Sequence, residues 1–453
     1  MTLRTAFSFL LALCLMAGSA FASSFGTTYG FSPRGMAMGN AMSAHVNTWD
    51  AVYYNVAGLG KTRHLVFDSR GKSGINQISI NYLHTRPDFD LNINRVDPNT
   101  GKNLSTNAAE DLSFGTVVLG MAMDLNTIYA MPDLISSARF GISMGINDDL
   151  TAVKINDTDP RTHNFLRYGK EAQRAMILAG TGFGFCDDLF GLGVGMNISF
   201  GGSGTIGVSD VIITEETQEP IDNATMEITL DPTLVAGFYL SPGKAVQALE
   251  GLDIGLSWRQ KSKLEISPLQ TVATMDAGNV LLNLQLALLD YFQPDIYTLG
   301  ISYAFTQRFL ASIEVERQMW SGFEASANHQ ANFGDELPEL EDIFVPKLGL
   351  EYKLSRRLAL QGGYCYEPSF VPDEGTTGTV NYLDNDKHIL SLGTSYRLRG
   401  FGRMKRDIDL FASYQHQILV NREVVKDDPT AYNPDYDYEG SCSTLFVGFT
   451  INM

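Results

Sequence analysis

Segments in which apolar and polar residues alternate recur along most of this chain, and they constrain its fold more than any other feature. Between Pro346 and Leu354, leucine and tyrosine occupy every second position, with lysine, glycine and glutamate between them. The same period of two recurs in 251–266, 309–318 and 388–398. A period of two predicts β-strands with two unlike faces. A soluble sandwich places the apolar face inside, whereas a membrane barrel places it outside.

The spacing of these segments distinguishes the two architectures. Odd-numbered connections span roughly 18 to 27 residues and even-numbered ones roughly 2 to 10, which is the loop asymmetry of an outer-membrane barrel. We therefore predict an all-β fold, a transmembrane antiparallel β-barrel of about fourteen strands. The predicted strands cover 75–84, 112–126, 137–147, 171–184, 189–203, 223–240, 251–266, 292–305, 308–321, 343–354, 357–368, 387–398, 406–418 and 438–453.

Composition excludes other classes of protein. The formal net charge of −18 opposes binding to nucleic acid, because phosphates repel an acidic chain. Apolar residues make up 44% of the chain, which argues against disorder. After the N-terminus, no apolar run approaches the ~20 residues that a membrane-spanning helix needs.

The N-terminus has the features of a secretory signal peptide. Arg4 precedes an apolar stretch over 7–17, and Ala20-Phe21-Ala22 matches an A-x-A cleavage site. We predict cleavage after Ala22, so that 1–22 is removed. Three cysteines then remain, and single buried thiols are favoured over one Cys365–Cys442 bridge.

Residues 23–74 lack clean alternation, although they are rich in apolar and aromatic side chains. Irregular backbone is tolerated at membrane depth only inside protein or a lumen. A barrel of fourteen strands is wide enough to need filling. We therefore expect 23–74 to form an N-terminal lumenal plug, or hatch, and 75–453 to form the barrel.

Five short motifs occur in order along the chain, at residues 54–59, 258–263, 346–366, 384–396 and 438–440. Together they resemble the FadL/TodX family of outer-membrane transporters of hydrophobic compounds. The first is similar to the N-P-A-G-L plug motif of that family, with valine in place of proline, and the other four resemble later strands and their entries. The plug-motif residues are Asn55, Val56, Ala57, Gly58 and Leu59.

The resemblance implies uptake of hydrophobic small molecules, such as long-chain fatty acids or aromatic hydrocarbons. Extracellular loops would capture the ligand, the plug would move, and the ligand would leave sideways at a kinked strand. The alternative is a PorV-like interaction or secretion-shuttle barrel without small-molecule transport, which the stretch 35–39 also resembles. The expected location is the outer membrane of a Gram-negative bacterium, and a monomer is expected.

Two sets of side chains are candidates for ligand contact. An apolar run in the fourth long loop could line a capture groove, or instead extend the eighth strand or pack against other loops. Lumenal charges could hold a polar head group, or instead pair with each other and with the plug. The groove candidates are Leu282, Leu284, Leu286, Leu288, Tyr291 and Phe292. The lumen candidates are Arg259, Lys261, Glu314, Glu316, Lys347, Glu351 and Arg397.

No catalytic, metal or cofactor site is predicted. The G-x-S-x-G match around Ser143 lies inside a predicted strand, whereas a nucleophile elbow needs a strand-to-helix turn. Asp384 and Asp386 could hold a cation, although a solvated loop is the favoured interpretation. Loops 204–222 and 322–342 are acidic and free of lysine and arginine. Divalent cations could bridge them to lipopolysaccharide, although simple solvation is the default expectation.

Overall fold

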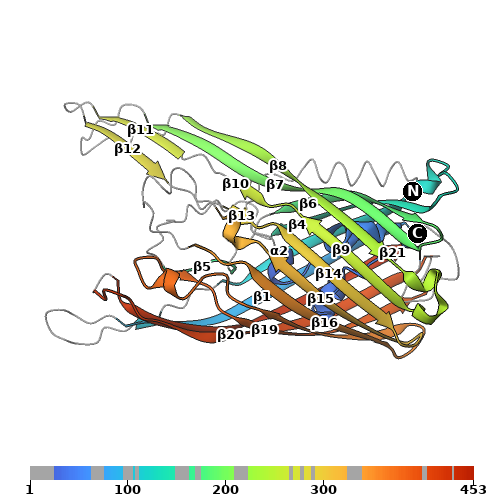
Figure 1. The fold of residues 1–453 in the computed structure, drawn as a ribbon. Helices are drawn as coiled ribbons and strands as arrows, with labels where there is room; N and C mark the ends of the chain where they lie inside the picture. Colours follow the sequence, from blue (N-terminus) through green and yellow to red (C-terminus); the bar gives the residue numbers. More distant parts are fainter. Residues whose placement is uncertain are drawn as a thin grey trace.

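Fourteen antiparallel strands close into a barrel, because the first strand pairs with the last. That seam is continuous from Gln77 opposite Asn452 to Asn94 opposite Asp435. Long connections lie at one end of the barrel and short turns at the other, as Figure 1 shows. The computed structural model describes residues 25–62, 76–94, 106–107, 112–147, 163–168, 175–208, 223–264, 269–275, 280–286, 291–323, 339–399, 406–430 and 433–453.

Each predicted strand overlaps one strand of the barrel. The barrel strands are β1 (Gln77–Asn94), β3 (Phe114–Asp124), β4 (Ile135–Asn147), β6 (Met176–Phe185), β7 (Phe190–Val208), β8 (Asn223–Leu240), β9 (Leu252–Arg259), β14 (Ile296–Ala304), β15 (Phe309–Gln318), β16 (Ile343–Lys353), β17 (Leu358–Glu367), β19 (Lys387–Leu398), β20 (Ile408–Val424) and β21 (Asp435–Asn452). Smaller strands are β2 (Thr106–Asn107), β5 (Asn164–Phe165), β10 (Ser262–Leu264), β11 (Leu269–Met275), β12 (Val280–Leu286), β13 (Tyr291–Gln293) and β18 (Tyr382–Leu383). Single-turn helices in the connections are η2 (Leu125–Thr127), η4 (Pro242–Lys244), η5 (Gln247–Leu249), η6 (Trp320–Gly322) and η7 (Glu374–Thr376).

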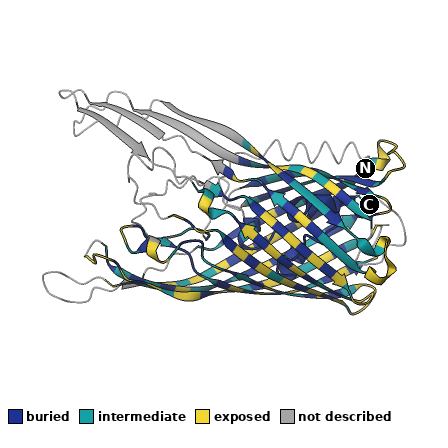
Figure 2. Ribbon diagram, viewed as in Figure 1, coloured by how far each residue is buried: buried dark blue, intermediate teal, exposed yellow. Residues whose placement is uncertain are grey.

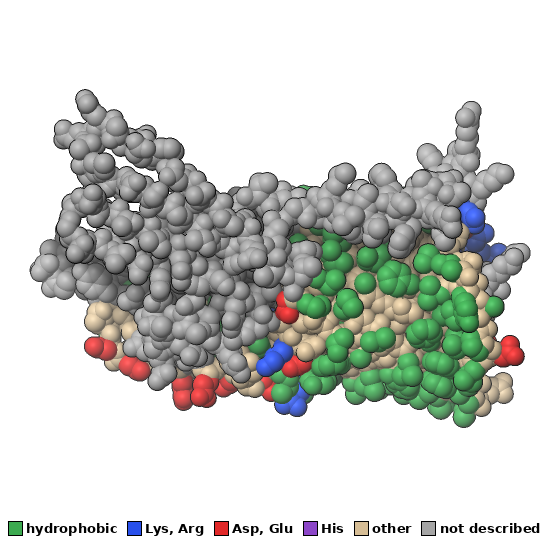
Figure 3. Space-filling model, turned by 90° about the horizontal axis from the view of Figure 1, so that it is seen from above, with side chains coloured by type: hydrophobic (Ala, Val, Ile, Leu, Met, Phe, Trp, Pro, Cys, Tyr) green, Lys and Arg blue, Asp and Glu red, His purple; other side chains and the backbone are tan. Residues whose placement is uncertain are grey.

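The alternation in sequence becomes an alternation of burial along each strand, visible as a chequered wall in Figure 2. In β16, Leu350 and Tyr352 are exposed on the outside, whereas Glu351 between them is 2% exposed and points inward. Figure 3 shows apolar side chains spread over the outer face of the strands, with charged side chains at its borders. The apolar-out, polar-in arrangement of a membrane barrel is therefore confirmed.

Several strands continue beyond the outer ends predicted for them, and the pattern inverts where they do. Lower in β1, Tyr82 is exposed and Asn81 is buried. Toward its outer end, Leu91 and Ile93 are buried and Asp90 is exposed. A strand that leaves the bilayer meets water on its outer face, so the apolar residues move to the inner face. This inversion explains why the sequence pattern alone ended the first strand near residue 84.

The β11–β12 hairpin lies in the fourth long connection, and its first strand pairs in parallel with the outer end of β7. This hairpin and the β7–β8 pair extend beyond the barrel at its long-loop end (Figure 1). Among the residues that the structure describes, no helix is long and apolar enough to cross a membrane.

Residues 25–62 fill the barrel interior and are called the N-terminal segment below. Ser32 caps α3, since its hydroxyl accepts a hydrogen bond from the Gly35 N–H at 3.1 Å and Pro33 begins the helix. Nearly every side chain of the segment is buried. Its helices are α2 (Phe25–Thr28), α3 (Pro33–Ala37), α4 (Ala51–Tyr54) and η1 (Val56–Gly60). Because residues 63–75 lie outside the described part of the chain, the division into 23–74 and 75–453 stays a prediction.

The three cysteines that remain after residue 22 are all unpaired. Cys365 and Cys442 are buried as single thiols, which matches the favoured expectation. Cys186 is exposed instead, in the turn between β6 and β7, where it has a φ of 52°.

Candidate functional site

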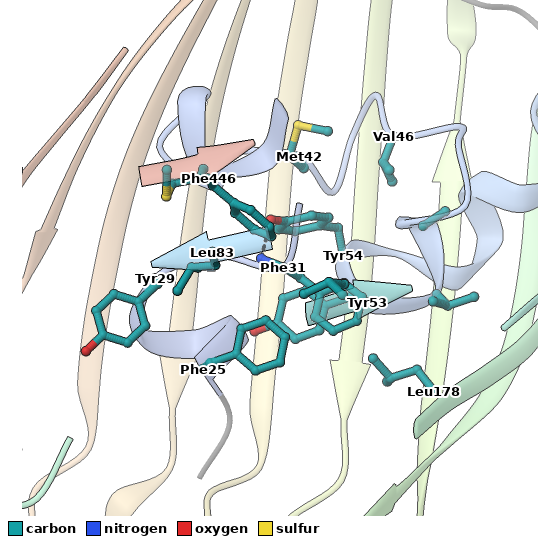
Figure 4. Close-up of a cluster of buried hydrophobic side chains, with 14 of the residues drawn as sticks. Phe25, Tyr29, Phe31, Met42, Val46, Tyr53, Tyr54, Leu83, Leu178 and Phe446 are labelled. Atoms are coloured by element: carbon teal, nitrogen blue, oxygen red, sulfur yellow. Dashed lines mark hydrogen bonds between the residues drawn. The ribbon is translucent and has the colours of Figure 1, made fainter. Parts of the chain in front are cut away.

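The interior of the barrel has an apolar side and a charged side. Aromatic side chains of the N-terminal segment pack with apolar side chains of β1, β3, β6 and β21 into one cluster, part of which Figure 4 shows. Phe31 stacks on Tyr53 with ring centroids 4.7 Å apart, and on Phe25 at 5.5 Å. Most of the buried carboxylates and cations of the wall lie instead on β9, β15, β16, β17 and β19, although Asp124 of β3, Arg139 of β4 and Asp409 of β20 are also buried.

The predicted plug motif, residues 55–59, joins the N-terminal segment to the wall. Asn55 is fully buried, and its Nδ2 donates to the carbonyl oxygens of Ser43 at 2.8 Å and Phe238 at 2.9 Å. Its Oδ1 accepts from the Ala57 N–H at 3.2 Å, which caps η1. One amide side chain therefore ties together two parts of the segment and strand β8.

Valine replaces the family's proline at position 56 without removing the helix that follows. Val56 is the first residue of η1, and Asn55 before it is extended with φ −163° and ψ 103°. The first position of a helix is the one where proline is tolerated, since the N–H there has no partner within the helix. The motif thus keeps its local geometry with either residue.

Glycines of β4, β6, β7 and β8 let η1 lie directly against the wall. A Cβ on Gly193 would come within 2.4 Å of the Ala57 nitrogen, and one on Gly182 within 2.5 Å of the Val56 carbonyl oxygen. A Cβ on Gly237 would meet Asn55 Oδ1 at 2.1 Å. We did not predict this surface, although glycine at every second position of 180–184 and 191–195 was a signal for it.

Arg139 of β4 holds the end of η1 and was also missed. Its Nε donates to the Leu59 carbonyl oxygen at 2.5 Å. Its Nη2 donates to the carbonyl oxygens of Lys61 at 2.6 Å and Asn47 at 2.8 Å. The side chain is 2% exposed, so it satisfies backbone carbonyls of the segment inside the barrel. Nothing in the sequence around Arg139 indicated these distant partners.

Four of the seven predicted lumen charges form one network. Lys347 Nζ lies 2.7 Å from Glu316 Oε2 and 3.3 Å from Glu314 Oε1. Arg259 Nη2 lies 3.5 Å from the same Glu316 oxygen. Glu314 Oε2 also accepts from the Ser43 N–H at 2.8 Å. Strands β9, β15 and β16 are brought together by these contacts, and the N-terminal segment is fastened to them.

The other three predicted lumen charges lie apart from this network. Glu351 pairs with Arg34 of α3 at 3.0 Å. Arg397 forms two hydrogen bonds to Asp409, at 2.6 and 2.7 Å. Lys261 does not join either group, because β9 ends at Arg259 and the lysine beyond it is exposed.

An aromatic and charged cluster lies at the outer mouth around residues 163–168. Arg167 is hydrogen-bonded to Glu367 and lies 3.1 Å from Asp384 Oδ1. Its guanidinium lies 4.5 Å from the centroid of the Phe370 ring, which stacks on Trp320 at 3.9 Å. Asp384 is 2% exposed, so the expectation of a solvated loop there was wrong. A buried arginine partner, recruited from a distant loop, stabilises the carboxylate inside protein.

Tyr168 extends this cluster inward to the N-terminal segment. Its hydroxyl donates to Gln417 Oε1 at 2.7 Å. Its ring lies edge-on to Phe89 at 4.7 Å and to Tyr29 at 6.4 Å. Apolar contacts therefore continue from the mouth to the segment that fills the barrel.

The candidate groove residues are only partly described. Leu282, Leu284 and Leu286 lie in strand β12, whose side chains, like that of Tyr291, lie outside the described part. Leu288 lies outside it entirely. Phe292 contacts Phe323 and Trp320 at centroid distances of 5.4 and 6.1 Å. The groove itself therefore stays a prediction.

Small cavities lie beside the N-terminal segment among the described residues. One lies against the charged wall and the face of Tyr53 and Tyr54. Another lies toward the short-turn end, where Arg34, Asp50 and Asp409 line it. Among the described residues, no group of three or more His, Cys, Asp or Glu could hold a metal ion. Ser143 lies within β4 and is buried, without a strand-to-helix turn.

Comparison with known proteins gives a family and a fold. Residues 186–453, more than half of the chain, match the family described as outer membrane protein transport protein (OMPP1/FadL/TodX). Alkane uptake protein A of Marinobacter nauticus is 24% identical over an alignment of 462 positions, which covers 95% of this chain and 93% of that protein.

Two solved structures share the architecture. A Pseudomonas aeruginosa FadL homologue matches with a TM-score of 0.54 and 15% identity, covering 96% of this chain and 100% of that one. The P. putida toluene transporter TodX matches with a TM-score of 0.50 and 14% identity, covering 94% of this chain and 99% of that one. At these identities the likeness shows the fold alone.

Proposed function

Because this chain belongs to the outer membrane protein transport family (OMPP1/FadL/TodX), we propose that it takes up hydrophobic small molecules across the outer membrane. The observation that carries this proposal is the apolar cluster, which includes Phe114, Leu178 and Phe446 and extends to Phe89 and Phe165 at the mouth. Apolar side chains of this kind dissolve a hydrophobic solute that a water-filled pore would not. The name of the M. nauticus relative supports an alkane-like ligand.

The N-terminal segment acts as the plug in this proposal. It fills the barrel between the mouth and the short turns, so a ligand passes only when part of it moves. Arg139 and Asn55 hold the end near η1 through hydrogen bonds. At the other end, apolar contacts of Phe25 and Tyr29 are joined by two hydrogen bonds, from β20 glutamines to the carbonyl oxygens of residues 28 and 29. We expect the end with more apolar contacts to move first, because a ligand can replace those contacts.

A sideways exit is favoured over an axial one. The cavity at the short-turn end of the segment is lined by Arg34, Asp50, Arg397 and Asp409. An apolar solute gains nothing from a path along buried charges, whereas the bilayer outside the wall dissolves it. The plug boundaries, cleavage after Ala22 and contact of the outer loops with lipopolysaccharide belong to this proposal, as does a monomeric state.

The secretion-shuttle alternative has less support, because the matching family and the M. nauticus relative are both described as transport or uptake proteins. The test is uptake by cells that lack the gene and carry it again on a plasmid. We expect the restored cells to take up radiolabelled hexadecane or toluene several-fold faster than the deletion strain. Equal rates for every hydrophobic solute, with the barrel present in the outer membrane, would exclude the transport function.

A further inference from the structure

A cavity lies beside the N-terminal segment on the charged side of the barrel interior. Its lining includes Tyr53, Arg259, Glu314, Glu316, Lys347 and Glu367. The chemistry of this lining therefore bears on which ligands the barrel accepts.

Both cations of the lining are already engaged by carboxylates. Lys347 Nζ lies between Glu316 at 2.7 Å and Glu314 at 3.3 Å. Arg259 is 3.5 Å from Glu316 and lies over the Tyr53 ring, 4.3 Å from its centroid. With three carboxylates facing two cations, the lining has no surplus positive charge.

The third carboxylate, Glu367, is held from the side of the mouth. Arg167 is hydrogen-bonded to it, and Lys387 Nζ lies 3.4 Å from its Oε2. Both of these cations also contact Asp384, at 3.1 Å for Arg167 and 3.7 Å for Lys387. The cations that a ligand would meet between the mouth and the cavity are therefore matched as well.

We infer that this lumen selects uncharged hydrophobic molecules over anionic amphiphiles, an inference that rests on the proposed uptake function. A ligand carboxylate or sulfonate would have to displace Glu314 or Glu316, or remain as an unpaired buried charge. A hydrocarbon or long-chain alcohol meets neither penalty. Nη1 of Arg259, which has no hydrogen-bond partner among the described residues, can donate to one neutral oxygen.

The test compares two ligands of one length, 1-hexadecanol and hexadecane-1-sulfonate, on the full-length protein in nanodiscs. The sulfonate stays ionised at every pH used, and empty nanodiscs correct for partition into lipid. We expect the alcohol to bind at least about tenfold more tightly, the factor that one charge-assisted contact commonly provides. Equal binding of the two ligands would overturn the inference.

Glu314→Gln and Glu316→Gln each release part of the hold on Lys347. In either variant the alcohol-to-sulfonate ratio should fall about tenfold, because a cation becomes available to the sulfonate. Glu439→Gln is the matched control, since it removes the same charge from an exposed position on β21 and should leave the ratio unchanged. The heat-dependent mobility of the barrel on gels reports whether each variant has folded.

The outcomes separate this inference from the proposed function. Uptake of hexadecane together with equal binding of alcohol and sulfonate would overturn the selectivity and leave transport standing. Absence of hexadecane uptake together with no binding of either ligand would overturn both. An unchanged ratio in both folded glutamine variants would also overturn the assignment to these carboxylates.

Discussion

Arg139 in the wall donates from Nε to the carbonyl oxygen of Leu59, at 2.5 Å, and thereby fixes the end of η1 in the plug motif. Its other contacts go to backbone carbonyls of the same segment, those of Asn47, Gly58 and Lys61. Removing a buried guanidinium that donates hydrogen bonds to carbonyl oxygens lowers stability by more than the loss of a charge, because each buried carbonyl oxygen then lacks a donor.

Arg139→Ala should loosen the segment around residues 56–61. We expect a local loss of about 2–4 kcal/mol, since buried acceptors are left without partners. Hydrogen exchange of the η1 amides measures the loss, and entry of small polar antibiotics into cells reports a leaking barrel. Arg356→Ala, at an exposed turn, is the control and should change neither. Unchanged protection of η1 would show that Arg139 does not hold it.

Val56→Pro should be accepted, because the residue begins η1 and Asn55 before it is extended. We expect unchanged or slightly higher thermal stability and normal uptake. Ala57→Pro, one position later, removes the N–H that Asn55 Oδ1 accepts and should destabilise the segment by about 1–3 kcal/mol. Equal effects of the two prolines on the melting temperature would refute this account.

Gly237→Ala should disturb the contact between η1 and the wall. A Cβ there would meet Asn55 Oδ1 at 2.1 Å, and overpacking of this kind costs about 1–3 kcal/mol. Gly362→Ala in β17 is the matched control, since its nearest atom would be 3.7 Å away. The difference in unfolding free energy between the two variants measures the close approach, and no difference would contradict it.

The barrel was predictable because alternation is a local signal. For a residue such as Glu351, between Leu350 and Tyr352, the two neighbours alone predict on which face of the strand it lies. The outer part of β1 was not predicted, because the local pattern changes there. Water replaces lipid outside the wall, so the apolar residues Leu91 and Ile93 lie on the inner face.

The interior was less predictable because its contacts are not local. The plug motif was placed by resemblance, yet its partners lie in strands far along the chain, such as Phe238 for Asn55. No sequence pattern around Arg139 or Arg167 predicts that the first binds backbone carbonyls and the second binds carboxylates. The predicted lumen charges were found together where neighbouring strands align them, as Glu314 and Lys347 are opposite in the β15–β16 pair. The prediction of a lumenal position for Lys261 was wrong, because strand β9 ends two residues earlier.

Lys426 gives the outer loops a defined dependence on pH. It donates to the carbonyl oxygens of Thr376, Gly378 and Val380 at 2.6, 2.9 and 3.0 Å, and burial lowers its pKa to about 8. Between pH 8 and its ordinary value of 10.5, the unfolded chain binds more protons at this site than the folded one. Stability from this group should therefore rise with pH across that window.

The comparison with Lys426→Met isolates this contribution from other groups that titrate. Urea unfolding of both proteins should be measured at pH 7.5, 9 and 10.5. The unfolding free energy of the wild type should rise relative to that of the variant as pH increases, because the unfolded chain binds more protons at residue 426. A difference that stays flat with pH would mean that the pKa of Lys426 is not lowered in the folded protein.

Arg167→Ala should open the outer mouth. The substitution leaves Glu367 and Asp384 buried with Lys387 as their remaining cation among the described contacts, and breaking such a cluster costs about 3–5 kcal/mol. Residues 163–168 should then lose hydrogen-exchange protection, and uptake at low hexadecane concentration should become faster if this closure limits entry. Arg317→Ala is the control, because its pair with Asp342 is exposed and worth at most about 1 kcal/mol. Unaltered protection of 163–168 in Arg167→Ala would show that the apolar contacts of Tyr168 alone hold the mouth closed.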